Sequence, residues 1–128
     1  MNRAADWFKQ AEADLQAAKD SAASAHHEWA AFQAQQCAEK AVKALVQHLH
    51  GSVRSHSVKQ IPDQLPAPLQ APAALLDAAR ELDKVYVTAR YPTSFVSGTP
   101  SDYFTAKNSE QLIGYARSIL EFCRSQIH

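Results

Sequence analysis

The sequence predicts an all-α protein, an up-and-down bundle of four long helices with one short helix between the second and the third. Three observations lead to this fold class. Apolar residues recur at steps of three and four along four long segments, helix-favouring residues dominate the composition, and no segment alternates apolar and polar residues as a strand does. The connections are short enough to join antiparallel neighbours. A length of 128 residues, 46% of them apolar, predicts a single domain over residues 1–128.

The first two helices are predicted at about residues 3–23 and 27–49. Gly51 follows the second helix where a glycine commonly takes the left-handed conformation that ends a helix, so we expect Gly51 to fill that position. Each helix carries one apolar stripe at helical spacing, which sets its buried face. The stripes consist of Trp7, Ala11, Leu15, Ala18 and Ala22 on the first helix, and of Ala30, Ala34, Cys37, Ala41, Leu45 and Leu49 on the second.

A short helix is predicted next, capped by Ser55, with Val58, Ile61 and Leu65 on its apolar side. The chain then carries four prolines in a short span, which exclude a continuous helix and predict a stiff loop. These prolines are Pro62, Pro66, Pro68 and Pro72.

The third long helix is predicted from about Ala73 to near Arg90, because Pro92 disfavours helical geometry at Tyr91. Residues 93–104 are predicted to be an irregular loop, and the last helix should span about 105–126. The buried faces are predicted to be Leu75, Ala79, Leu82 and Tyr86 on the third helix, and Leu112, Ala116, Leu120, Cys123 and Ile127 on the last.

The formal net charge is zero, so the molecule as a whole has no electrostatic attraction to nucleic acid or to an anionic membrane. No apolar run approaches the roughly 18 residues that a membrane span needs. The N-terminal residues lack the apolar segment of a signal peptide. We therefore predict a cytoplasmic protein with no membrane partner, in which Cys37 and Cys123 are buried free thiols.

The second predicted helix carries a polar stripe in which every side chain can donate hydrogen bonds and none is a carboxylate. At helical spacing this stripe is roughly 80° wide. It is either an ordinary solvated face or a face turned toward a ligand or a second copy of the chain. Glu39 lies at its edge and can pair with Lys43 at i,i+4. The stripe consists of Gln33, Gln36, Lys40, Lys43 and Gln47.

Further donors gather at the end of the third helix, in the stretch "LDKVYVTARYP". Lys84 adds a charge, and the planar guanidinium of Arg90 suits phosphate or carboxylate. Tyr86 and Tyr91 offer faces on which a base can stack. In the alternative interpretation, Tyr86 is a core residue and Arg90 bonds to carbonyls at the helix end. His56, just after the second helix, is either a local capping residue or a further wall of the same cavity.

The sequence lacks the motifs of the common catalytic and metal centres. His26 and His27 are adjacent, and His48, His50 and His56 lack cysteines or clustered carboxylates at ligand spacing. Three scattered glycines exclude a P-loop and a dinucleotide-binding turn, and there is no GxSxG. We therefore predict no metal site, no cofactor and no catalytic residue.

Several segments, in order, resemble the HEPN family. "WFKQAEADLQAAKDS" resembles its opening helix, and "WAAFQAQQCAEKAVKALVQHLHG" its second helix, with the spacing of Gln36, Glu39, Lys40 and Lys43 in place. "SHSVKQI" is similar to the family's short histidine-containing segment, and "LDKVYVTARYP" to its "LDxxYxxxRYP" signature. "TPSDYFT" and the final helix also match. The pattern resembles most the small free-standing prokaryotic HEPN proteins and the C-terminal HEPN domain of sacsin.

This resemblance implies a helical bundle that forms a homodimer. It also implies a positively lined cavity at or near the dimer interface that binds nucleotides, which in the sacsin domain are purine nucleoside triphosphates. By position, the resemblance places Lys40, Lys43, His56, Lys84, Arg90 and Tyr91 in the lining.

Many HEPN proteins are ribonucleases or toxins with an arginine, a polar residue and, four to six residues on, a histidine on a late helix. Here no histidine follows Arg90 until His128, and only three residues separate Arg124 from His128. We therefore predict a non-catalytic nucleotide-binding homodimer, with ATP or GTP as ligand and a separate minimal nucleotidyltransferase as a candidate protein partner. The predicted nucleotide-binding residues are Gln36, Lys40, Lys43, His56, Lys84, Tyr86, Arg90 and Tyr91.

Two alternatives remain at this stage. The protein could be a HEPN ribonuclease or toxin component that acts on RNA through Arg124 and His128. It could also be a protein-interaction module, such as an antitoxin-like bundle, that takes no small ligand.

Overall fold

The computed structural model describes residues 2–51, 56–59 and 71–127. In chain order its elements are α1 (Ala4–Ala23), α2 (His27–His48), α3 (Ala73–Asp83), α4 (Val85–Thr88), the 3-10 turn η3 (Pro92–Ser94), α5 (Pro100–Tyr103) and α6 (Ala106–Gln126). No β-strand occurs in these residues, and the predicted all-α bundle is confirmed. None of the described helices combines the length and apolar character that a membrane crossing requires.

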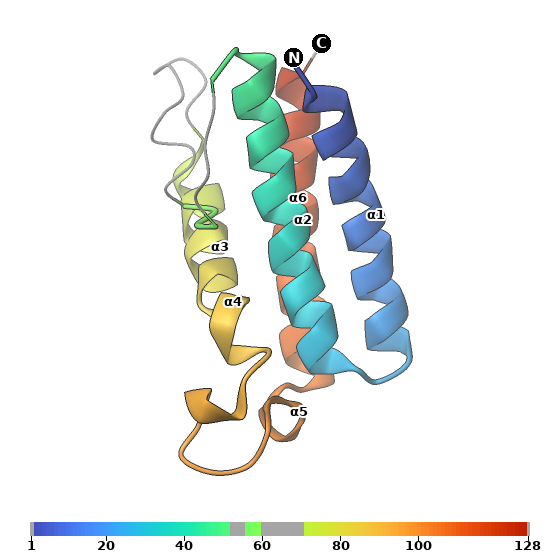
Figure 1. Cartoon of the computed structure of the whole chain (residues 1–128), viewed down its shortest axis with the longest axis vertical. Helices are drawn as coiled ribbons and strands as arrows, with labels where there is room; N and C mark the ends of the chain where they lie inside the picture. The colour runs from blue at the N-terminus through green and yellow to red at the C-terminus, as the bar shows by residue number, and fades with distance from the viewer. Residues whose placement is uncertain (1, 52–55, 60–70, 128) are drawn as a thin grey trace.

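Helix α2 is the central element. It packs against α1, α3, α4, α5 and α6. Figure 1 shows it between α1 on one side and α3 with α4 on the other, with α6 behind it. The two ends of the chain lie together at one end of the bundle, and the segment between α4 and α6 lies at the opposite end. Because α2 has neighbours on most sides, its polar side chains must find partners on other elements.

The core follows the predicted apolar stripes. Ala11 and Ala18 on α1 and Ala34, Cys37 and Ala41 on α2 are completely buried. Such small side chains let the α1 and α2 backbones approach closely. Cys37 and Cys123 are both free and buried, as predicted. Desolvation by burial is the main reason that the pKa of each thiol is raised from 9.0 to about 12.

The C-terminus of α2 differs from the prediction by one residue. His50, with φ at 65°, occupies the left-handed position expected for Gly51. The N–H of His50 donates to the carbonyl of Gln47 at 2.9 Å and that of Gly51 to the carbonyl of Val46 at 2.8 Å. This pair of bonds forms a Schellman motif, in which the residue after the C-cap is left-handed. Gly51 is instead needed because it has no side chain, since a Cβ there would lie 2.7 Å from Cγ1 of Val46.

The third predicted helix is divided at Lys84 into α3 and α4, and α4 ends at Thr88. Tyr91 is extended, with φ at −123° and ψ at 128°, as expected for a residue before Pro92. The predicted irregular loop contains η3 and α5, and Thr99 and Asp102 form a capping box at the start of α5. The prediction missed this short helix because the box is followed by only one turn.

The predicted short helix after α2 lies largely outside the described residues. Val58 is described, and it is buried, as expected for a residue on the apolar side. Ser55, Ile61, Leu65 and three of the four prolines fall in residues 52–55 and 60–70, outside the described part of the chain.

Candidate functional site

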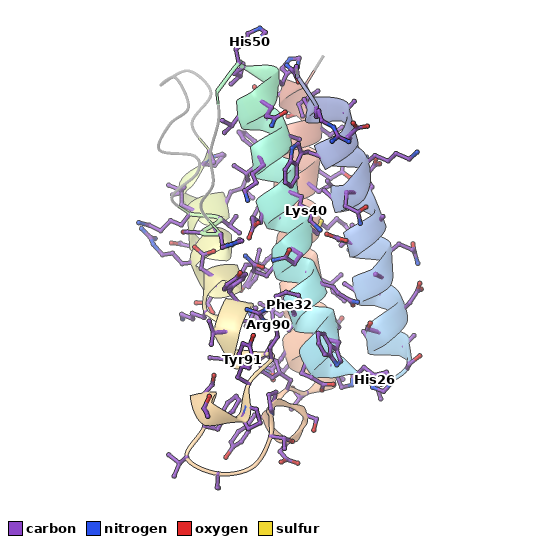
Figure 2. The ribbon with its side chains drawn as sticks, in the orientation of Figure 1. His26, Phe32, Lys40, His50, Arg90 and Tyr91 are labelled. Atoms are coloured by element: carbon purple, nitrogen blue, oxygen red, sulfur yellow. The ribbon has the colours of Figure 1, made fainter. Side chains whose placement is uncertain are left out.

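Arg90 lies among three aromatic rings at the point where α4 ends. Its guanidinium carbon is 4.5 Å from the ring centroid of Phe32, 4.7 Å from that of Tyr86 and 5.0 Å from that of Tyr91. Figure 2 shows Phe32, Arg90 and Tyr91 together at this end of the bundle. Its Nε donates to the backbone carbonyl of Tyr86 at 2.9 Å, which is the predicted helix-end bond. The rings and this bond hold the planar guanidinium in one orientation.

The charge of Arg90 is not matched by an acid. Within the described residues, Arg90 forms no ion pair, and its side chain is half-buried. Tyr91 beside it is 48% exposed, and Trp29, at 49%, packs edge-on against Phe32 with centroids 6.2 Å apart. A guanidinium held by rings at a surface, without a carboxylate, is a receptor for a planar or tetrahedral anion.

His56 forms a further wall of this site. Its ring stacks on that of Tyr86, with centroids 4.9 Å apart and an interplanar angle of 19°. The His56 side chain is 60% exposed, while its Nδ1 lies 3.3 Å from Oε1 of Glu39. We call Phe32, His56, Tyr86, Arg90 and Tyr91 the Arg90 cluster.

Asp83 on α3 holds the segment that carries His56. Its carboxylate accepts hydrogen bonds from the Ser57 hydroxyl at 2.8 Å and from the backbone N–H groups of Val58 at 2.7 Å and Lys59 at 3.1 Å. Bonds from a turn to a single carboxylate are charge-assisted and fix the backbone of that turn. Asp83 therefore positions His56 without contacting it.

Glu39 is the centre of a buried polar network behind the Arg90 cluster. Glu39 is 3% exposed. Its Oε2 accepts a hydrogen bond from Nζ of Lys43 at 3.0 Å, which confirms the predicted i,i+4 pair. Its Oε1 accepts from Nε2 of Gln35 at 3.3 Å, and the same nitrogen donates to the carbonyl of His56 at 3.0 Å. Gln36 Nε2 donates to Oε1 of Gln35 at 2.8 Å. Among the described residues, Lys43 and Gln36 therefore reach the cluster through Glu39 and Gln35.

The polar stripe of α2 is divided between two neighbours. On the α1 side, Lys40 pairs with Asp14 at 2.6 Å and Gln33 accepts from the Ser21 hydroxyl at 2.7 Å. Gln47 accepts from the backbone N–H of Arg3 at 2.9 Å. These side chains join α2 to α1 and to Arg3, the residue just before α1. Lys40 is therefore not brought together with the Arg90 cluster.

Lys84 also lies apart from the cluster. Its Nζ donates to Glu81 one turn earlier at 2.8 Å, and its side chain is 68% exposed. It lines a groove between α4 and α6 whose walls include Thr88, Phe95 and Tyr115. Of the eight predicted binding residues, four meet in the Arg90 cluster: His56, Tyr86, Arg90 and Tyr91.

Sequence reasoning did not identify the parts of the site that lie on the inner side of α2. Phe32 and Gln35 were not predicted as site residues, and Glu39 was noted only for its pair with Lys43 and for its place in the HEPN-like spacing. The available signal was that Gln35 and Glu39 interrupt a run of small apolar residues, where a polar side chain must be buried and therefore satisfied. Asp83 carried no signal of its own, because its partners lie far away in the chain.

Other candidate metal-binding or catalytic side chains are bonded to neighbours in the fold or lie outside the described residues. Within the described residues, no group of three or more His, Cys, Asp and Glu side chains is arranged to hold a metal ion. His27 Nδ1 lies 2.9 Å from the Ser109 hydroxyl. Arg124 pairs with Glu12 at 3.0 Å and with Glu121 at 3.1 Å, and the histidine proposed to work with it, His128, is outside the described residues.

The model of the HEPN domain family matches residues 4–126. The chain belongs to the HEPN family. Among solved structures, it is similar to a protein from Thermus thermophilus at 35% identity, with a TM-score of 0.96 and coverage of 98% of this chain and 99% of that one. A crystal structure described as an archaeal HEPN homologue is 39% identical, covers each chain completely and has a TM-score of 0.85.

A HEPN domain protein from Thermotoga maritima is 32% identical, with a TM-score of 0.76 and coverage of 94% of this chain and 95% of that one. A search of curated proteins found no match. These comparisons establish the HEPN fold over nearly the whole chain. They leave the ligand of the Arg90 cluster to be argued from its own chemistry.

Proposed function

We propose that this HEPN protein binds a nucleotide at the Arg90 cluster and does not transform it. The observation that carries the proposal is the Arg90 guanidinium, which is held among aromatic rings and has no carboxylate partner among the described residues. A guanidinium fork binds phosphate through two parallel hydrogen bonds. The exposed ring of Tyr91 beside it, and the exposed ring of His56, which stacks on the Tyr86 ring that Arg90 contacts, are surfaces on which a base stacks, each base worth about 1–3 kcal/mol.

The predicted residues take different parts in this proposal. Arg90 binds the phosphate, Tyr91 and His56 provide ring faces, and Tyr86 holds Arg90 and His56 in place through its own ring. Lys43 and Gln36 support the site through Glu39 and Gln35. Lys40 and Lys84, which bond to Asp14 and Glu81, are left as contributors to stability and to the surface.

Calorimetric titration with ATP, GTP, AMP and GMP tests the proposal. We expect at least one of these nucleotides to bind, and Arg90→Ala to weaken it by about tenfold or more, because a charge-assisted bond is worth roughly 1.5–3 kcal/mol. Lys84→Ala is the matched control, since Lys84 is a nearby cation paired at the surface. Absence of binding to all four nucleotides, or equal binding by wild type and Arg90→Ala, contradicts the proposal.

Two finer parts of the proposal concern assembly. Resemblance to other HEPN proteins favours a homodimer and, as a partner, a separate minimal nucleotidyltransferase for which this protein holds the nucleotide. Light scattering on the isolated protein tests the first part, with a monomeric mass as the contradicting result. Co-purification with a minimal nucleotidyltransferase from the same cells tests the second part, and its loss in Arg90→Ala would link the partner to the nucleotide site.

A second candidate function, cleavage of RNA, is favoured by the contact between Glu39 and His56. A carboxylate on Nδ1 fixes the histidine tautomer and leaves Nε2 as a proton acceptor. Nε2 would take the proton of a ribose 2′-hydroxyl, the O2′–P bond would form as the P–O5′ bond breaks, and the imidazolium would return the proton to the 5′-oxygen. Arg90, which contacts the same Tyr86 ring, would stabilise the phosphorane.

Incubation with single-stranded RNA distinguishes this second candidate from simple binding. Cleavage to 2′,3′-cyclic phosphate ends that is lost in His56→Ala and retained in Arg124→Ala would establish it. Uncleaved RNA leaves the binding proposal as the function of the site.

A further inference from the structure

Most of the cationic side chains predicted to line the binding site are already paired with carboxylates of the protein. Lys40 is paired with Asp14 at 2.6 Å, Lys43 with Glu39 at 3.0 Å, and Lys84 with Glu81 at 2.8 Å. Each of these three lysines, which look like a cationic set in the sequence, is thus balanced by its own carboxylate. Among the eight predicted binding residues, Arg90 is the cation that forms no ion pair with a described residue.

A further cation among the described residues, Lys59, lies on the same short turn as His56. Its backbone N–H donates to Asp83, and within the described residues its side chain forms no ion pair. It is half-buried. Among the described residues, the site therefore offers one fixed positive charge, that of Arg90, and Lys59 is the further cation on the turn that carries His56.

Glu39 opposes the addition of more negative charge. Its carboxylate is 3% exposed and lies 3.3 Å from Nδ1 of His56, on the inner side of that ring. Among the described residues, Lys43 is the lysine or arginine that pairs with this carboxylate, so a ligand that drew on Lys43 would leave the buried carboxylate without that counter-charge. Separating a buried pair is costly, because each charge is then left in a medium of low dielectric constant.

A phosphodiester carries one negative charge and a phosphomonoester one to two. Those charges match Arg90 and Lys59, the cations that the described residues offer at this site. A nucleoside triphosphate presents further charged phosphates for which the described residues around Arg90 supply no cation. The exposed ring of Tyr91 lies directly beside the guanidinium, with its centroid 5.0 Å from the guanidinium carbon, so a base can stack next to the phosphate that Arg90 holds.

Building on the proposed function, we propose that the Arg90 cluster is specific for one phosphate beside a flat base, and gains nothing from a second or third phosphate. This chemistry has two sources, a free nucleoside monophosphate and a phosphodiester within a single strand. The discrimination comes from Glu39, which keeps Lys43 from the ligand, and from Arg90, which holds one phosphate.

The test is a calorimetric comparison of AMP, GMP, the dinucleotide ApA, ATP and GTP, the last two with and without Mg²⁺. We expect the triphosphates to bind no more than about threefold tighter than the monophosphates. Binding of ATP or GTP about tenfold or more tighter than AMP and GMP overturns this inference but leaves nucleotide binding intact. Absence of binding to every ligand overturns both, so the two failures are distinguishable.

The two sources are separated by the ApA arm. Affinity for ApA about tenfold above that for AMP assigns the site to a strand, whereas equal affinity assigns it to a free mononucleotide. Either result supports the one-phosphate inference.

Three variants locate the specificity. Tyr91→Ala should weaken AMP, ApA and ATP by a similar factor of about tenfold, because stacking does not depend on phosphate number. Lys59→Ala and Lys84→Ala, which replace surface or half-buried residues, should leave the ratio of ATP to AMP affinity unchanged. A selective loss of ATP binding in either lysine variant would show that further phosphates are recognised, and would overturn the inference.

Discussion

The two sides of α2, one facing α1 and the other facing α4, present similar hydrogen-bond donors whose partners differ. Toward α1, the stripe side chains are satisfied within the protein: Lys40 by Asp14, Gln33 by Ser21. Toward α4, Arg90 has ring faces and one carbonyl but no described carboxylate, and His56 is largely exposed. A donor whose partner is supplied by the fold stabilises the fold, whereas a donor held in place without an anionic partner is available to a ligand.

Glu39→Ala should have the largest effect, because Glu39 is the internal counter-charge on the α4 side. Removal leaves Lys43, 8% exposed, as an unpaired buried charge, which costs about 3–5 kcal/mol. Urea denaturation measures the loss. The double variant Glu39→Leu with Lys43→Met removes both charges and should recover most of the stability. A cost below about 1 kcal/mol for Glu39→Ala would show that water reaches this pair.

The thiols of Cys37 on α2 and Cys123 on α6 probe the buried side of the bundle. Asp14, which pairs with Lys40, adds to the effect of burial on the pKa of Cys37. The pKa of each thiol is 9.0 in the unfolded chain and about 12 in the folded one. Above the lower value the unfolded state releases protons that the folded state keeps, so stability falls as pH rises. Each thiol then costs about 1.4 kcal/mol by roughly pH 10.

Denaturation at about pH 8 and pH 10 tests this second prediction. Wild type should lose about 3 kcal/mol more than the variant Cys37→Ala with Cys123→Ala. Parallel losses in the two proteins would mean that the thiols ionise as easily in the folded state as in the unfolded one.

Asp83→Ala tests whether the α4 side depends on a positioned His56. Three donors from residues 57–59 lose their acceptor, so we expect a loss of about 1–3 kcal/mol in stability. Nucleotide affinity should fall as well, because the ring of His56 is no longer held against Tyr86. Asp77→Ala, at an exposed acid on the same helix, is the control. A stability loss with unchanged affinity would remove His56 from the site.

Lys40→Ala and Arg90→Ala should separate the two sides of α2 directly. Lys40→Ala breaks a partly buried pair and should cost about 1–2 kcal/mol of stability, with nucleotide affinity unchanged. Arg90→Ala should cost less stability, about 1 kcal/mol, and weaken nucleotide binding by about tenfold or more. Denaturation and calorimetry on both variants give a crossed pattern. Reduced affinity in Lys40→Ala would place the ligand against α1.

The smallest effect is expected at Gly114, which lies on α6 and belongs to neither side of α2. A Cβ at this position meets no atom within 4 Å, so Gly114→Ala should stabilise the helix by about 0.5–1 kcal/mol. Thermal denaturation measures the change, with nucleotide affinity as the reference that should not move. A destabilising outcome would mean that the open space beside Gly114 is filled in solution, for example by a second copy of the chain.

The helices could be predicted closely from the sequence, whereas the site was predicted only in part. Arg90 and Tyr91 were placed at a helix end because Pro92 stops the helix locally. Lys40 was grouped with them because it lies on one stripe with Lys43, yet two side chains on one stripe can meet different neighbours. Spacing along a helix gives direction around its axis, but not which element lies in that direction.

Periodicity and proline placement are local properties, so they were enough to predict α1, α2 and α6, the apolar faces and the helix end before Pro92, but not the division of the third helix at Lys84. The partners of charged side chains depend on contacts between residues far apart in the chain, such as Lys40 with Asp14 or Asp83 with the turn at 57–59. Only tertiary packing brings such residues together. It therefore decided that three lysines are balanced by carboxylates and that Arg90 is left without one among the described residues.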